Sequence, residues 1–257
     1  MSSVFARSES DEAIQFISAR WIASLCSQRQ FNTKLKENRF SSQTKSKQRI
    51  ADHGEVFTAE REVNAMLDLV KNETGRIESR FLEPACGDGN FLAEILRRKL
   101  AVVKSRYGKN VYEYERYAVI AVTSIYGVEL LPDNASECRK RLFEIFDKEY
   151  AANCKKESNA ETRQSVRYIL KRNILCGNAL TMNDACGDPL VFSEWAAVNS
   201  CRLKRRDFVF EEMIELKETD LFSSKKSHVN DAGRTVFIAQ PVREFPPVHY
   251  RKVQELE

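Results

Sequence analysis

The chain has 257 residues, of which 42% are hydrophobic and 30% charged, with a formal net charge of +4. This length fits one α/β domain with appendages, and the composition is ordinary for a soluble protein. No apolar run approaches the length of a membrane span, and residues 1–7 lack the apolar core of a secretory signal. We therefore expect a soluble, cytoplasmic chain without a membrane partner.

Cysteine and histidine usage argues against a disulfide framework and against a metal centre. The seven cysteines are an odd number and include no Cys-x-x-Cys pair. The three histidines, His53, His228 and His249, are widely scattered. We expect reduced, mostly buried cysteines and no bound metal.

The N-terminal region combines a helical pattern with a basic stretch. Residues 11–29 have apolar side chains at spacings of three and four behind a capping Ser10, which predicts a helix. Seven basic residues and one acid follow between positions 27 and 50. This pattern is typical either of phosphate binding or of a solvated loop. We assign residues 1–50 to an N-terminal helix and basic linker, and residues 51–257 to the main domain.

Residues 81–91, Phe-Leu-Glu-Pro-Ala-Cys-Gly-Asp-Gly-Asn-Phe, predict a buried strand, a glycine turn and the start of a helix. Gly87 and Gly89 permit positive φ and close approach of the backbone to a ligand. Glu83, at the end of the strand, can accept hydrogen bonds from an ammonium group or a ribose. Apolar residues from Leu92 to Val103 continue at helical spacing. The segment is typical of a nucleotide-like cofactor site.

A second strand is predicted at residues 125–129, and it ends in Glu129. An acid at this position accepts hydrogen bonds from cofactor ribose hydroxyls, although a structural glutamate is the alternative. The separation from Glu83 exceeds the ~20 residues of the simplest nucleotide-binding unit, so residues near 105–117 look like an insertion. Residues 119–122 fit helix or strand. One further helix is expected to begin after Thr58, which is its predicted N-cap, and another is expected from Pro132 to Tyr150.

Three strings together resemble the motifs of the DNA adenine N6-methyltransferases, which use S-adenosylmethionine (SAM). Residues 81–91 resemble the SAM loop, residues 53–58 resemble the motif that precedes it, and residues 173–180 are similar to the third motif. The resemblance implies that Phe57 and Thr58 contact the methionine end of SAM, and that Glu83, Ala85 and Gly87 make the amino-acid and loop contacts. It further implies that Glu129 contacts the ribose and Asn178 the adenine. Asn178 replaces the family's usual acid, which implies a weaker, uncharged contact.

The family's acceptor-base loop, Asp/Asn/Ser-Pro-Pro-Tyr/Phe, is not found. The one Pro-Pro pair, at residues 246–247, lacks the flanking polar and aromatic residues and predicts an extended segment. Residues 189–195 predict a fourth strand, on which Ser193, Glu194 and Trp195 are weak candidates for a nonstandard catalytic pocket. A buried tryptophan and a surface glutamate are the alternative.

The C-terminal region carries a second basic cluster, which is a candidate for nucleic-acid contact or ordinary surface charge: Arg202, Lys204, Arg205 and Arg206. A helix at 208–218, a polar loop containing His228, and a strand at 235–239 that completes the edge of the sheet are also predicted.

The resemblance implies an α/β fold, namely the Rossmann-like class I SAM-dependent methyltransferase fold with an N-terminal helical extension. It also implies a SAM-binding subunit of a DNA adenine methyltransferase of a restriction-modification system, completed by a second methyltransferase or specificity subunit that supplies the acceptor-base loop. Two alternatives stay open: an autonomous methyltransferase, and a non-catalytic module that binds DNA or a protein partner.

Overall fold

The computed structural model describes residues 49, 58–199, 201–214, 227–229, 235–237 and 239–256. The expected helix at 11–29, the basic stretch apart from Arg49, and Phe57 lie outside the described residues. Within the described part of the chain, no helix has both the length and the apolar character that a membrane crossing requires. The same residues contain no group of three His, Cys, Asp or Glu side chains placed to hold a metal ion.

A three-stranded parallel sheet lies at the centre of the fold. It consists of β1 (Phe81–Glu83), β2 (Ile125–Glu129) and β3 (Ile174–Cys176), in the order β1-β2-β3. Glu83 pairs with Gly127, so β2 extends beyond the end of β1, and Glu129 pairs with Cys176. Because the strands are parallel, their carboxyl ends meet at one edge, where ligands bind in open α/β sheets. The mixed α/β architecture agrees with the prediction.

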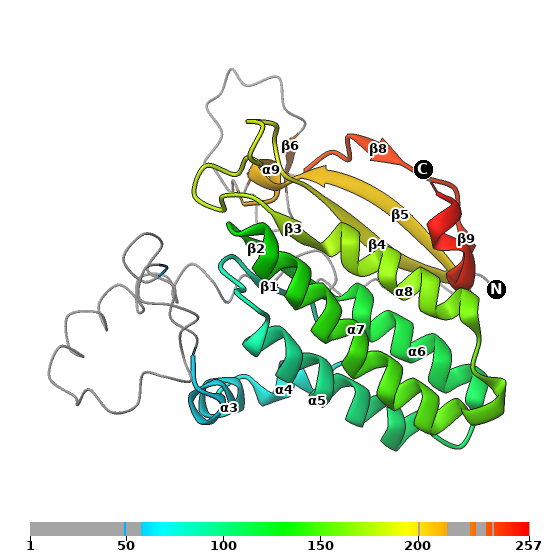
Figure 1. The fold of residues 1–257 in the computed structure, drawn as a ribbon. Coiled ribbons are helices and arrows are strands. Elements are labelled where there is room, and N and C mark those ends of the chain that lie inside the picture. Colours follow the sequence, from blue (N-terminus) through cyan, green and yellow to red (C-terminus); the bar gives the residue numbers. More distant parts are fainter. Residues whose placement is uncertain are drawn as a thin grey trace, which may run out of the picture.

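Helices cover one face of this sheet, as Figure 1 shows for the group from α5 to α8. The helices in contact with the sheet are α5 (Asn90–Tyr107), α6 (Val111–Thr123), α7 (Pro132–Cys154) and α8 (Ala160–Asn173). Two short helices, α3 (Glu60–Asp68) and α4 (Lys71–Thr74), pack against α5, and the 3-10 helix η2 (Lys155–Glu157) follows α7. The apolar positions predicted along α5 are buried: Leu92, Ile95, Leu96, Leu100 and Val103. Burial of this stripe is the main reason for the stability of the helix, because propensity alone is a weak force.

One helical prediction needs correction, and the structure decides the form of two other segments. Ala59, rather than Thr58, is the N-cap of α3. The expected insertion near 105–117 is largely helical, since α5 continues to Tyr107 and α6 begins at Val111. Asn110 is the N-cap of α6, and its side chain accepts the N–H groups of Tyr112 and Glu113. Residues 119–122 belong to α6 and are almost fully buried. An apolar run of this length fits a buried helix and a buried strand equally well, and only packing distinguishes them.

A second, antiparallel sheet follows the parallel one. β4 (Val191–Asn199) pairs with β5 (Arg202–Val209), which also pairs with β8 (Arg243–Glu244) and β9 (Val248–His249). The predicted fourth strand therefore exists, but it does not join the parallel sheet. The Pro-Pro pair lies between β8 and β9, in the extended segment that the sequence predicts.

The C-terminal predictions are corrected further. The helix predicted from residue 208 starts at Phe210, as α9 (Phe210–Ile214). His228 lies in β6 (Ser227–Val229), not in a loop. β7 (Thr235–Phe237) pairs with β6 in a separate two-stranded sheet, so it does not complete the edge of the main sheet. The final element is the 3-10 helix η3 (Tyr250–Glu255).

The start of the antiparallel hairpin covers the other face of the parallel sheet. Along β2, Ile125 points into the helical core, whereas Tyr126 and Val128 pack against Phe192 and Phe210. The Tyr126 and Phe192 rings meet edge to face with centroids 5.6 Å apart. This division follows from the period of two in a strand. The parallel sheet is thus buried on both faces, and its carboxyl edge remains for a ligand.

Two buried charges tie distant segments together. The Lys99 ammonium donates to the Ser124 hydroxyl at 2.8 Å and to three backbone carbonyls within residues 76–79, which immediately precede β1. The Glu115 carboxylate, in α6, accepts from the hydroxyls of Tyr150 and Tyr250 and from Arg251 Nε at 2.6 Å. Glu115 therefore fastens η3 to the helical layer.

Candidate functional site

The glycine turn between β1 and α5 has the geometry that the sequence predicts. Gly87 has φ 55° and Gly89 has φ 90°, a region that favours glycine. The turn is fixed by hydrogen bonds from Cys86 N–H to the Val128 carbonyl at 3.0 Å and from Gly89 N–H to the Cys86 carbonyl at 2.8 Å. A Cβ at Gly89 would lie only 2.7 Å from Cys138 Sγ. Both the backbone conformation and the packing therefore require glycine at position 89.

Glu83 ends β1 beside this turn. Burial raises the pKa of Glu83 to about 7, although the Ala85 N–H, which bonds to the carboxylate, works in the opposite direction. Among the described residues no cation forms an ion pair with Glu83. A ligand ammonium placed here would stabilise the ionised carboxylate.

Glu129 ends β2 on the other side of the turn and is 8% exposed. Its Oε2 accepts the Gly87 N–H at 2.8 Å. Its Oε1 accepts the Leu131 N–H at 3.1 Å and Asn134 Nδ2 at 3.3 Å. The structure therefore brings together Glu83, Gly87 and Glu129 at one edge of the sheet, and Glu129 itself holds the glycine turn.

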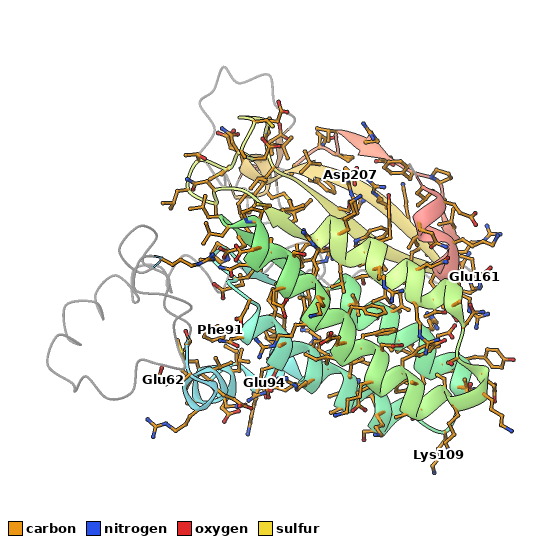
Figure 2. All side chains as sticks on the ribbon, viewed as in Figure 1. Glu62, Phe91, Glu94, Lys109, Glu161 and Asp207 are labelled. Atoms are coloured by element: carbon orange, nitrogen blue, oxygen red, sulfur yellow. The ribbon has the colours of Figure 1, made fainter. Side chains whose placement is uncertain are left out.

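The start of α5 connects the turn to Thr58. Asn90 Nδ2 donates to the Thr58 carbonyl at 3.2 Å, and Arg141 donates to Asn90 Oδ1 at 2.6 Å. Figure 2 labels Phe91, which follows Asn90 in the first turn of α5. Ala85 is exposed within the turn. Thr58 thus lies next to the turn, as its predicted role requires.

Asn178 follows β3 and is occupied in shaping a local turn. Its Oδ1 accepts the N–H groups of Leu180 at 2.8 Å and Thr181 at 3.4 Å. The amide nitrogen keeps its donors, while one acceptor oxygen already serves the backbone. Both lone-pair positions of this oxygen are thus filled, and the predicted contact with an adenine amino group would require one of these two backbone hydrogen bonds to give way.

Two exposed leucines at the same edge were missed by the sequence reasoning. Leu130, directly after Glu129, is 53% exposed, and Leu180, two residues after Asn178, is 82% exposed. The Leu130 carbonyl lies 3.7 Å from Cys176 Sγ, at the end of β3. Apolar residues that follow the polar end of a buried strand were the available signal. Their side chains offer surface on which an aromatic ring can pack.

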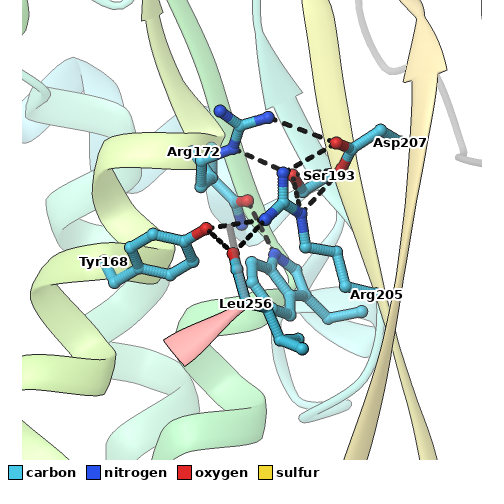
Figure 3. A network of polar contacts seen from close by, with 8 residues as sticks. Tyr168, Arg172, Ser193, Arg205, Asp207 and Leu256 are labelled. Atoms are coloured by element: carbon cyan, nitrogen blue, oxygen red, sulfur yellow. Dashed lines mark hydrogen bonds and ion pairs between the residues drawn. The ribbon is translucent and has the colours of Figure 1, made fainter. Parts of the chain in front are cut away.

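The weak catalytic candidates take part in internal contacts. Figure 3 shows Ser193 in a buried network, where its hydroxyl donates to Asp207 at 2.7 Å and accepts from Arg205 at 3.1 Å. Trp195 is 5% exposed and donates to Asn173 Oδ1 at 2.9 Å. The prediction of a buried tryptophan fits this geometry.

Glu194 differs from the surface glutamate that was considered as its alternative role. Its carboxylate pairs with Arg80 at 2.8 Å and with Arg206 at 2.6 Å, and its side chain is 11% exposed. These pairs link the hairpin to the segment that enters β1.

The second basic cluster lies on β5, where successive side chains alternate between faces. Arg205 is 2% exposed and pairs with Asp207 at 2.7 Å, so the prediction that it contacts phosphate is wrong for this structure. Lys204 pairs with Glu244 at 2.8 Å. Arg202 is exposed and keeps its candidacy for phosphate contact. The sequence did not show that the neighbouring Arg205 and Arg206 point to opposite faces of β5.

Comparison with protein families decides the wider assignment. Residues 43–187 match the family described as MmeI, DNA-methyltransferase domain. The chain belongs to this family of DNA-methyltransferase domains. No curated protein and no solved structure matches it. The matched range contains all three strings on which the resemblance to DNA methyltransferases was based, and that resemblance is confirmed.

A methyltransferase domain of this kind implies SAM as its cofactor. The residues present fit such a ligand at three points. Glu83 offers a carboxylate whose raised pKa suits a cationic partner, the Gly87–Gly89 turn permits close approach of the backbone, and Glu129 stands at the neighbouring strand end. The DNA-methyltransferase family and the site geometry are therefore consistent with each other.

Proposed function

We propose that the chain is the SAM-binding part of a DNA adenine N6-methyltransferase of a restriction-modification system. The observation that carries this proposal is the convergence of Glu83, Gly87 and Glu129 at one edge of the parallel sheet, within the range that matches the MmeI domain. The Rossmann-like class I fold belongs to the same proposal, since the order β1-β2-β3 is half of a doubly wound sheet.

Each cofactor-binding residue has a proposed role, which for Phe57 rests on the sequence motif alone. Glu83 would hold the ammonium group, Ala85 and Gly87 the methionine portion through the turn, and Glu129 the ribose. Phe57 and Thr58 would enclose the methionine end, and Asn178 would meet the adenine. SAM, when bound, supplies a methyl group on a positively charged sulfur. The work left to the protein is orientation of the acceptor nitrogen in line with that methyl.

The acceptor side of the reaction requires a further element. The sequence contains no Asp/Asn/Ser-Pro-Pro-Tyr/Phe string, and the Pro-Pro pair at 246–247 lies between strands that pair with β5. Ser193 and Trp195 are committed to internal hydrogen bonds. These observations favour a second polypeptide that carries the acceptor-base loop and completes the enzyme on DNA.

The test combines a binding measurement with a transfer assay on the same preparation. We expect isothermal titration calorimetry to show one SAM bound per chain. We expect methyl-labelled SAM and unmethylated DNA to give no N6-methyladenine with this chain alone. Label in N6-methyladenine would contradict the split enzyme and support an autonomous one. Absence of SAM binding would contradict the whole proposal and favour a non-catalytic module.

A further inference from the structure

The carboxylate of Glu129 has a defined set of partners around its two oxygens. An ionised carboxylate offers about four lone-pair positions, two on each oxygen. Oε1 accepts two donors, the Leu131 N–H at 3.1 Å and Asn134 Nδ2 at 3.3 Å. Oε2 accepts one donor from the described residues, the Gly87 N–H at 2.8 Å. One position therefore remains for a ligand, and it lies on Oε2.

Asn134 is placed to enforce this asymmetry. It is the third residue of α7 and is 1% exposed, and Pro132 opens that helix at its first turn. A buried amide on a helix start is a rigid donor, because packing fixes its rotamer. Asn134 thereby keeps Glu129 from rotating and occupies the acceptor position that Oε1 would otherwise offer.

We propose that Asn134 is a positioning residue that restricts Glu129 to reading a single ribose hydroxyl of the cofactor. A carboxylate with both oxygens available could accept the 2′- and 3′-hydroxyls together. With Oε1 filled by Leu131 and Asn134, only Oε2 can receive a hydroxyl proton. This inference rests on the proposed function, because it assumes that the nucleoside of SAM lies at the carboxyl edge of β2.

The wild-type chain tests the first part with three ligands: SAM, its 2′-deoxy analogue and its 3′-deoxy analogue. A hydrogen bond to a charged group is expected to change affinity by about tenfold or more. One deoxy analogue should therefore bind at least about tenfold more weakly than SAM, and the other within about threefold. Equal losses for both analogues would overturn the single-hydroxyl assignment.

Variants test the second part. In Asn134→Ala the ratio between the two analogues should shrink to about threefold or less, because Oε1 regains an acceptor position. A merely structural role would weaken all three ligands by one factor and leave the ratio unchanged, which would overturn the role of Asn134. The matched control is Asn159→Ala. Asn159 is likewise an asparagine at a helix start, as the N-cap of α8, but it lies beyond the far end of α7, a helix of 23 residues or about 34 Å.

Glu129→Ala separates this inference from the proposed function. In that variant SAM should bind more weakly and the ratio between analogues should disappear. Persistence of the ratio would mean that another residue reads the ribose, which would overturn the inference while SAM binding still supported the cofactor site. Failure of the wild-type chain to bind SAM would overturn the proposed function itself, and the inference with it.

Discussion

Substitution of Glu83 by Gln tests whether this carboxylate receives the ammonium group of SAM. Burial raises the pKa of Glu83 to about 7, so the ionised fraction is about 3% at pH 5.5 and about one half at pH 7.0. Only the ionised form attracts an ammonium, and an α-amino group with a pKa near 8 stays protonated throughout this range. SAM affinity of the wild-type chain should therefore rise about 16-fold between these pH values.

The variant should remove this dependence as well as some affinity. Glu83→Gln keeps the shape and an acceptor oxygen but loses the charge, so SAM should bind about 10- to 100-fold more weakly at pH 7, with a nearly flat pH profile. Calorimetry in two buffers of different ionisation enthalpy should show nearly one proton released per SAM bound by wild type at pH 6. Glu144→Gln, an exposed change on α7, is the matched control.

The same pKa predicts an effect on stability with a defined sign. A carboxyl whose pKa is raised in the folded state binds its proton more tightly there than in the unfolded chain. Its favourable contribution is complete below about pH 4.5 and is lost as pH rises through about 7. Glu83→Gln should therefore raise the melting temperature of the ligand-free chain at pH 7.5 and leave it unchanged near pH 4. For the binding argument, a SAM affinity of the wild-type chain that is constant from pH 5.5 to 7.0 would refute the role of the Glu83 carboxylate.

Three further substitutions probe the frame around the site. Lys99→Met should lower the free energy of unfolding by about 3 kcal/mol in urea titrations, because three carbonyls lose their buried donor; a loss below about 1 kcal/mol would contradict this. Glu115→Gln should cost about 3 kcal/mol in the same assay, since it leaves the guanidinium of Arg251 without its anion, and Glu113→Gln, whose side chain on the same helix is 41% exposed, should cost little. Gly89→Ala should abolish SAM binding and lower the melting temperature, because both its φ and its contact with Cys138 exclude a Cβ; wild-type affinity would refute the close packing of the turn.

The cofactor edge was predictable because its signals are local. A strand ending in an acid, two glycines at a turn and an amphipathic run follow one another between Phe81 and Val103, and the structure contains each of them. The position of Glu129 was also predictable, since β2 ends in an acid after an apolar run. The residue roles toward SAM stay predictions that the experiments above address.

Packing decided what the local sequence had left open. Val119 to Val122 fit two secondary structures, and burial in the helical layer selected the helix. The fourth strand predicted at residues 189–195 exists, but the sequence does not show which strand it pairs with. In the structure β4 pairs with β5, and its Phe192 and Trp195 rings lie in two different cores.

The sequence by itself determined the strand–turn–helix unit, the acids at the strand ends and the membership in a DNA-methyltransferase family, because these depend on short motifs and local periodicity. Only the tertiary structure decided which charges are free to meet a ligand. Arg205 and Glu194 are polar in the sequence, yet ion pairs with Asp207, Arg80 and Arg206 hold them inside the protein. Whether a charge faces solvent or a buried partner depends on residues brought together from distant parts of the chain, and the local sequence does not specify that meeting.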